Sequence, residues 1–216
     1  MRKLRTIAAI AATIIALITL SLSPAKAQMT PTGDEYAALG TVSLAAALKL
    51  DAPAFDSNWQ DHDILVHLLK RVLDAKPDSP LKALADGTIP LTVLAPDDLA
   101  FRALAGYRNG RGVILSTEAR VYAFIAKLNI NSLERVLNYH VVPFEVLDAL
   151  ALLSSNGLSL PTVEGAPIRV SIATSVRLVD VSAQQRSSLV RLSDVDINKG
   201  NRQIAHSLSA VLLPSF

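Results

Sequence analysis

The sequence predicts an α+β domain in which helices dominate the first half of the chain and strands dominate the second. Two patterns support this class. Apolar residues recur every three or four positions between residues 61 and 76, whereas β-branched residues alternate with other residues from about residue 158 onward. Helical and strand patterns do not alternate along the chain, which argues against a doubly wound α/β sheet.

The first long helix is expected to start near Asp61, which together with Asp63 offers a capping carboxylate. Pro77 and Pro80 end it. One face of this helix is apolar and is formed by Ile64, Leu65, Leu68, Leu69, Val72 and Leu73.

A short helical piece over 81–87 leads into the stretch "LTVLAPDDLAF". Its first five residues, 91–95, are expected to form a buried strand that ends at Pro96. Asp97 can cap the helix that follows. A turn is expected over 109–112, where glycines and an asparagine cluster.

A further helix is expected over 117–128, and Asn131 or Ser132 can cap the next one. That helix leads into "VLNYHVVP" (136–143), where a strand is expected over 139–142. Later strands are expected within "PIRVSIATSVRLVDV", "LVRLSDVDI" and "QIAHSLSAVLL".

Residues 1–27 have the layout of a secretory signal peptide: a basic start, an apolar run to about Leu22, and the small-residue site "AKA". Cleavage after Ala27 would leave residues 28–40 as a flexible segment before a domain spanning 41–216. The alternative is an uncleaved membrane anchor, because the apolar run is near the lower limit for spanning a bilayer. No cysteine follows the run, which excludes a lipid-anchored lipoprotein.

Without residues 1–27 the chain has 17 Lys+Arg against 19 Asp+Glu, a formal charge of −2. The basic character of the whole chain therefore provides no argument for nucleic-acid binding. An exported chain without cysteine folds without disulfides, which favours a bacterial source over a eukaryotic secretory route. We expect an extracytoplasmic protein, either at the cell surface, in the periplasm or secreted.

No catalytic, cofactor or metal site is expected. His62 and His67 are five residues apart and so do not share a helix face, and we expect an exposed helix face there. No serine lies in a G-x-S-x-G turn, and the glycines between 106 and 112 do not form a phosphate-binding loop.

His206 lies on the strand face that carries Ile204 and Leu208, which is a core face. Burying a charged imidazole there would cost several kcal/mol. A neutral ring with one hydrogen-bonded nitrogen is therefore expected.

Three segments together resemble the fasciclin-like (FAS1) domain: "LTVLAPDDLAF" (91–101), "VLNYHVVP" (136–143) and "NRQIAHSLSAVLLP" (201–214). Their order and spacing also agree with that family, and the likeness covers about residues 41–216. The closing segment is similar to that of single-domain secreted bacterial members. Departures from the family pattern occur at Leu94, Asp97, Ala205 and Ser209.

The resemblance implies a FAS1 fold, with helices packed on a curved, wedge-shaped sheet. It also implies that His140 hydrogen-bonds the turn at Asp97 and Asp98, so that these residues and His206 are structural. Tyr139 would then face away from His140 and contact a partner. The basic turn with Lys199 and Arg202 is a second candidate contact, although such a turn is usually only a solvated loop.

Three functions remain open. The resemblance implies a non-catalytic adhesion module for cell-surface or matrix proteins or polysaccharides, with membrane contact only if residues 1–27 are retained. An extracytoplasmic carrier could hold a small apolar ligand in a cleft between the helical and sheet halves. An enzyme using His140 with Asp97 or Asp98 is the third possibility. No pattern indicates the oligomeric state.

Overall fold

The structure is a computed structural model that describes residues 36–51, 53–108, 115–182 and 187–215. The expected signal peptide and the turn over 109–112 lie outside the described residues. Residues 36–40 were expected to be flexible, but the Leu39 N–H closes a turn on the Tyr36 carbonyl over 3.1 Å, and the Gly40 N–H donates to the Gly200 carbonyl over 2.8 Å. Within the described part of the chain, no helix is long and apolar enough to cross a membrane.

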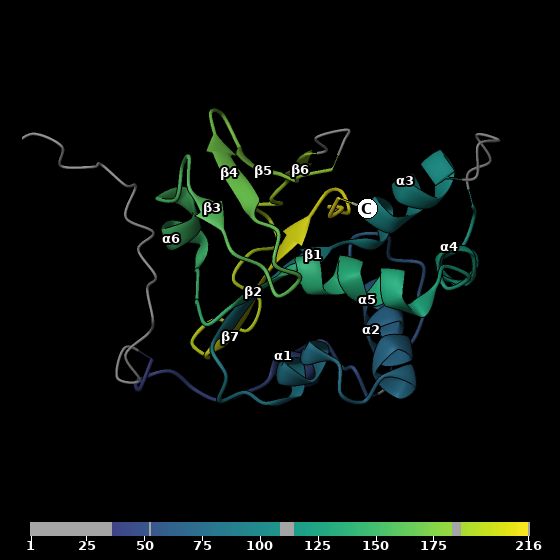
Figure 1. The fold of residues 1–216 in the computed structure, drawn as a ribbon, viewed down its shortest axis with the longest axis horizontal. Coiled ribbons are helices and arrows are strands. Elements are labelled where there is room, and N and C mark those ends of the chain that lie inside the picture. Colours follow the sequence, from purple (N-terminus) through teal and green to yellow (C-terminus); the bar gives the residue numbers. More distant parts are fainter. Residues whose placement is uncertain (1–35, 52, 109–114, 183–186, 216) are drawn as a thin grey trace, which may run out of the picture. The chain divides into compact units, whose positions relative to one another are not determined.

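The helices are concentrated in the first half of the chain, as predicted (Figure 1). They are α1 (Leu44–Ala47), α2 (Asp63–Ala75), the 3₁₀ helix η1 (Pro80–Ala85), α3 (Asp98–Arg108), α4 (Glu118–Ile125), α5 (Ile130–Tyr139) and α6 (Ala149–Leu153). Ser43, Thr117 and Asp148 cap α1, α4 and α6 with side-chain oxygens.

Helix α5 differs from the prediction at both ends. Asn129 caps it by accepting from the Asn131 N–H, so the expected cap at Asn131 or Ser132 was wrong by at least two residues. The helix continues through Tyr139, and the expected strand over 139–142 begins only at Val141. The segment 136–143 is apolar in either conformation, so its sequence alone does not show where the helix ends and the strand begins.

The central sheet has three strands in the order β2-β1-β7. These are β1 (Leu91–Pro96), β2 (Val141–Pro143) and β7 (Gln203–Leu208). Strand β1 pairs antiparallel with β2 and parallel with β7, in a register that places Leu91 opposite Gln203. All residues of β1 and β7 are buried, which is usual for strands covered on both faces.

The second sheet is antiparallel, in the order β3-β4-β5-β6. Its strands are β3 (Ser159–Leu160), β4 (Ile168–Ile172), β5 (Val176–Val179) and β6 (Ser187–Leu189). Of the strand expected in "LVRLSDVDI", Leu189 belongs to the end of β6, and Val190 and Ile197 form only isolated bridges. Asp196 and Asn198 have positive φ angles of 57° and 68°, which are incompatible with a continuous strand.

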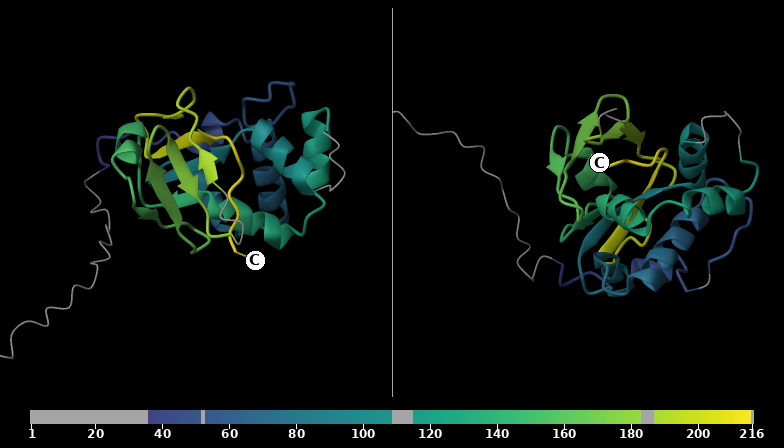
Figure 2. Two further views of the ribbon diagram at one scale, coloured as in Figure 1. Left: turned by 90° about the horizontal axis from the view of Figure 1, so that it is seen from above. Right: turned by 45° about the vertical axis from the view of Figure 1, so that its right-hand side comes forward.

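Two apolar cores lie on opposite faces of the central sheet. Along β1, Val93 and Ala95 belong to the core formed with helices α2 to α5, whereas Leu94 belongs to the core shared with the second sheet. Figures 1 and 2 show the backbone elements that form these cores, with the second sheet in green on one side of the central sheet and helices α2 to α5 in blue to teal on the other. The fold is therefore α+β in three layers.

Gln203, the first residue of the expected strand segment "QIAHSLSAVLL", is fully buried at the start of β7. Its side-chain NH₂ lies 2.8 and 2.7 Å from the carbonyls of Ala83 and Asp86, and its oxygen accepts from the Leu44 N–H over 2.8 Å. This one amide therefore fastens α1 and η1 to the central sheet.

Replacing Gln203 by leucine is expected to lower the free energy of unfolding by about 1–3 kcal/mol, because buried backbone groups lose their partners. Urea denaturation of the variant and the wild type measures this. The exposed Gln60 supplies the control, since Gln60→Leu removes an amide without buried partners. Equal stability of both variants would show that the Gln203 bonds contribute nothing.

Candidate functional site

His140 does not contact the Asp97–Asp98 turn, so this prediction was wrong. It follows α5 directly, and its Nδ1 lies 2.7 Å from the Val136 carbonyl while its Nε2 accepts from the Leu212 N–H over 3.1 Å. The C-cap position directs the ring back toward its own helix instead of toward β1. Burial lowers the His140 pKa to about 4, so the ring is neutral with its proton on Nδ1.

The two aspartates of the turn instead cap two different helices. Asp97 accepts from the Ala100 N–H over 2.8 Å, as predicted for the cap of α3, and also forms an ion pair with Arg191. Asp98 accepts from the Ile64 N–H over 3.0 Å, and so caps α2 from outside that helix. Both side chains are fully buried.

His206 lies in the core, and both of its ring nitrogens have partners. Nε2 lies 2.6 Å from the Leu147 carbonyl, and Nδ1 accepts from the Asp196 N–H over 3.3 Å. Burial lowers the pKa of His206, in keeping with a neutral ring that carries its proton on Nε2. The sequence led us to expect only one bonded nitrogen.

Tyr139 is fully buried, so its predicted role as a partner contact was wrong. As the last residue of α5 it points into the core shared with the second sheet. Its hydroxyl donates to the Pro167 carbonyl over 3.0 Å and accepts from the Val181 N–H over 3.2 Å. Tyr139 therefore ties α5 to the second sheet.

The other two predicted contact residues are engaged within the domain. Lys199 forms an ion pair with Asp196, with 2.6 Å between Nζ and Oδ2. The Arg202 guanidinium donates from Nε to the Tyr36 carbonyl over 3.2 Å and from an Nη to the Thr88 carbonyl over 3.4 Å. Arg202 thus attaches the segment at Tyr36 to the body of the domain.

His62, Ser207 and Asp194 form a hydrogen-bonded triplet that the sequence did not predict. His62 was expected on an exposed helix face but is only 8% exposed, which corrects that expectation. The Ser207 hydroxyl lies between the other two, 2.6 Å from His62 Nε2 and 2.5 Å from Asp194 Oδ2. In a nucleophilic triad the histidine lies between serine and aspartate, so this fully buried serine connects β7 to the start of α2 instead.

Four carboxylates gather where the helices α2, α3 and α4 begin; we call Asp61, Asp63, Asp98 and Glu118 the acid cluster. One oxygen each of Asp63, Asp98 and Glu118 lies within 4.8 Å of the other two. Each of the four residues has a buried carboxylate oxygen that lacks a hydrogen-bond partner. Among the described residues, no ion pair joins the acid cluster to a basic side chain.

The acid cluster is electrostatically costly. Burial raises the pKa of Asp98 to about 8. The hydrogen bond from the Ile64 N–H lowers this pKa in part, and the neighbouring carboxylates raise it further. Burial together with Asp63 and Asp56 raises the pKa of Asp61 to about 6. Such perturbed carboxyl groups are typical of sites that bind a ligand or a proton.

The family model of the fasciclin domain matches residues 60–214. This protein belongs to the fasciclin domain family. Among solved structures it is similar to a FAS1 domain pair from the insect cell adhesion molecule fasciclin I, at 18% identity and a TM-score of 0.40. That match covers 67% of this chain and 45% of the insect chain, so the protein spans less than half of it. The search of curated proteins found no match.

The FAS1 domain exposes four large apolar side chains between residues 144 and 158, which we call the α6 segment. Phe144, Leu150, Leu153 and Leu158 are 58%, 72%, 46% and 56% exposed. Leu150 and Leu153 are three residues apart and so share one face of α6. Phe144 also has a φ of 62°, a left-handed conformation that costs a non-glycine residue about 1–2 kcal/mol.

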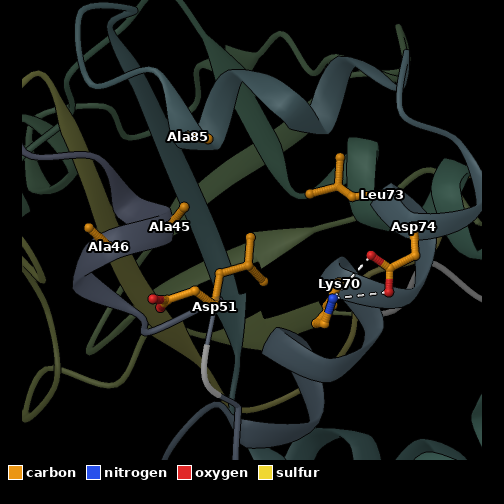
Figure 3. A pocket seen from close by; sticks show the side chains of 8 residues that line it. Ala45, Ala46, Asp51, Lys70, Leu73, Asp74 and Ala85 are labelled. Atoms are coloured by element: carbon orange, nitrogen blue, oxygen red, sulfur yellow. Dashed lines mark hydrogen bonds and ion pairs between the residues drawn. The ribbon is translucent and has the colours of Figure 1, made fainter.

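A pocket of about 510 Å³ lies between α1, η1 and α2 of the FAS1 domain (Figure 3). Its apolar lining includes Leu50 and Leu73, and its charged lining includes Asp51, Lys70 and Asp74. Lys70 is paired with Asp74 over 3.1 Å. The pocket lies on the helical side, not in the cleft between helices and sheet where a carrier site was expected.

Proposed function

We propose that the protein is a non-catalytic adhesion module, exported from a bacterial cell and binding proteins or polysaccharides of a cell surface or extracellular matrix. Membership of the fasciclin family supports the adhesive role. The signal-like residues 1–27, with cleavage near Ala27, and the lack of cysteine support export. The observation that carries the proposal is the α6 segment, whose four large apolar side chains are exposed on this domain.

The α6 segment is suited to binding because its apolar side chains are held away from the core. Leu152 of the same helix is 1% exposed and anchors α6, while Leu150 and Leu153 are exposed to solvent. Large apolar side chains grouped on one segment are typical of protein contact sites, whereas single exposed ones are common everywhere. The strained backbone at Phe144 fits a residue retained for its exposed ring.

Catalysis is less well supported. His140 has no contact with Asp97 or Asp98, and its ring nitrogens bond backbone groups of Val136 and Leu212. The hydroxyl of Ser207 is buried and hydrogen-bonded to an acid. A carrier of apolar ligands is also less well supported, because three charged residues line the pocket between α1, η1 and α2.

Replacing both Leu150 and Leu153 by serine is expected to weaken adhesion at least tenfold, because the variant no longer buries these two apolar side chains against its partner. The melting temperature should change little, since both side chains are exposed in the free domain. Binding of the purified protein to immobilised surface extract of the producing cell, with thermal unfolding in parallel, measures both effects.

Two further variants sharpen this experiment. Leu192→Ser changes a leucine that is 59% exposed outside the α6 segment, and it should bind normally. Phe144→Gly removes the ring and relieves the strain of the positive φ. This variant should bind less tightly, while its free energy of unfolding should stay within about 1 kcal/mol of the wild-type value. Unchanged binding by the leucine pair and by Phe144→Gly would exclude the α6 segment as the adhesive surface.

A further inference from the structure

We propose that Asp63, Asp98 and Glu118 bind a divalent cation, with Ca²⁺ as the best-fitting ion and Asp61 as a fourth acidic neighbour. The three residues are the first residues of α2, α3 and α4, which pack against one another (Figure 1). A bound ion would therefore join the starts of three helices.

The geometry suits an oxygen-coordinated ion. Ca²⁺ holds its ligands at about 2.3–2.6 Å, so two oxygens on opposite sides of one ion are about 5 Å apart. The oxygens offered by Asp63, Asp98 and Glu118 lie within 4.8 Å of one another and can therefore reach a single ion.

The carboxylates are already oriented by hydrogen bonds. Glu118 uses Oε2 to accept from the Asp56 and Ser57 N–H groups, both over 3.1 Å, and Asp98 uses Oδ1 to accept from the Ile64 N–H. The second oxygen of each is buried and accepts no bond from an N–H group or a hydroxyl, and the side chain that Asp98 meets is another acid, Asp61. A buried acceptor without a donor is costly, and a cation at this place would satisfy both.

The charge balance also favours a cation. A helix N-terminus supplies about half a positive charge, so three of them supply about +1.5. When all four carboxylates are ionised they carry −4, which leaves an excess of about two to three negative charges that no basic side chain among the described residues neutralises. A divalent ion neutralises most of this excess, and proton sharing between Asp61 and Asp98 is the alternative.

The donors select the type of ion. The unpartnered atoms of the acid cluster are all carboxylate oxygens, which suit hard cations, whereas Zn²⁺ prefers nitrogen and sulfur ligands. Mg²⁺ usually keeps several waters and is seldom enclosed by protein carboxylates alone. Asp56 lies with Asp61 and Asp63 in a second group of acids within 4.8 Å, so further oxygen ligands are close at hand.

Calorimetric titration of the EDTA-treated, dialysed protein with CaCl₂ tests the site, with MgCl₂ and NaCl titrations for comparison. Saturating CaCl₂, at about a hundred times the dissociation constant, is expected to raise the melting temperature by about 5–10 °C over the protein in EDTA. MgCl₂ should act more weakly, and NaCl at equal ionic strength should not reproduce the effect.

Variants locate the ion. Glu118→Gln keeps an acceptor for Asp56 and Ser57 but removes a charge, so calcium affinity should fall at least tenfold while the protein in EDTA melts at the same or a higher temperature. Asp63→Asn serves the same purpose should Glu118→Gln fail to fold. Asp78→Asn, at a fully exposed acid, should bind Ca²⁺ normally. The proposal would be overturned if the wild type did not bind calcium, or if a folded Glu118→Gln or Asp63→Asn variant bound it as tightly as the wild type. A proton shared between Asp61 and Asp98 would then reduce the charge of the acid cluster.

Discussion

Replacement of Tyr139 by alanine is expected to lower the free energy of unfolding by about 3–5 kcal/mol, the range typical for truncating a buried aromatic residue. The ring is fully buried in the core between the central and second sheets, so the substitution opens a cavity there. It also leaves the Pro167 carbonyl and the Val181 N–H without their partner. Urea denaturation followed by circular dichroism measures the loss.

Tyr139→Phe separates the two contributions. It keeps the ring and removes only the hydroxyl, so the expected cost is about 1–2 kcal/mol. A folded Tyr139→Ala variant of nearly wild-type stability that had lost adhesion would instead restore Tyr139 as a contact residue.

Acidification from pH 7 to pH 4 is expected to remove about 3 kcal/mol of stability through His140 alone. Burial lowers its pKa from the usual 6.5 to about 4, so the unfolded chain binds more protons than the folded domain between these values. The contribution of the neutral His140 to stability is therefore fully present above about pH 6.5 and is lost as the pH falls toward 4. The physical cause is local, because a proton on Nε2 would face the Leu212 N–H, a second donor.

The His140→Gln variant isolates this contribution. Asp180, the charged group that acts on His140, stays in place, and so do the carboxyls of Asp61 and Asp98, whose raised pKa values act in the opposite direction. The stability difference between wild type and variant should shrink as the pH falls, by about 3 kcal/mol at pH 4. A constant difference in urea denaturation from pH 7 to pH 4 would show that His140 does not titrate between the two states.

The family and the layout of the fold were predictable because they depend on short-range patterns. The apolar spacing of α2 and the strand over 91–95 need no knowledge of their neighbours. Tyr139 was misassigned because the segment around it is apolar in either conformation. Only packing decides that the helix continues to Tyr139 and that its last residue faces the second sheet.

The acid cluster could not be predicted from sequence for a different reason. Its members are spread over residues 61–118 of the sequence. Taken alone, each one is simply an acidic residue near the start of a helix, which is a common and purely structural feature. The sequence does show the usable signal, since three neighbouring helices each begin with a carboxylate. What it lacks is the tertiary packing that brings Asp63, Asp98 and Glu118 to one point.

The parallel pairing of β1 with β7 has a consequence for the order of folding. The central strand ends at Pro96, and its parallel neighbour begins only at Gln203, more than a hundred residues later. Until the ribosome has made that neighbour, β1 is an apolar edge without its partner, and the loop to be closed is long. Such distant pairing slows folding. Under the export proposed above, the sheet would be completed only after the chain has crossed the membrane, and its exposed edge would have to be shielded from aggregation on the way.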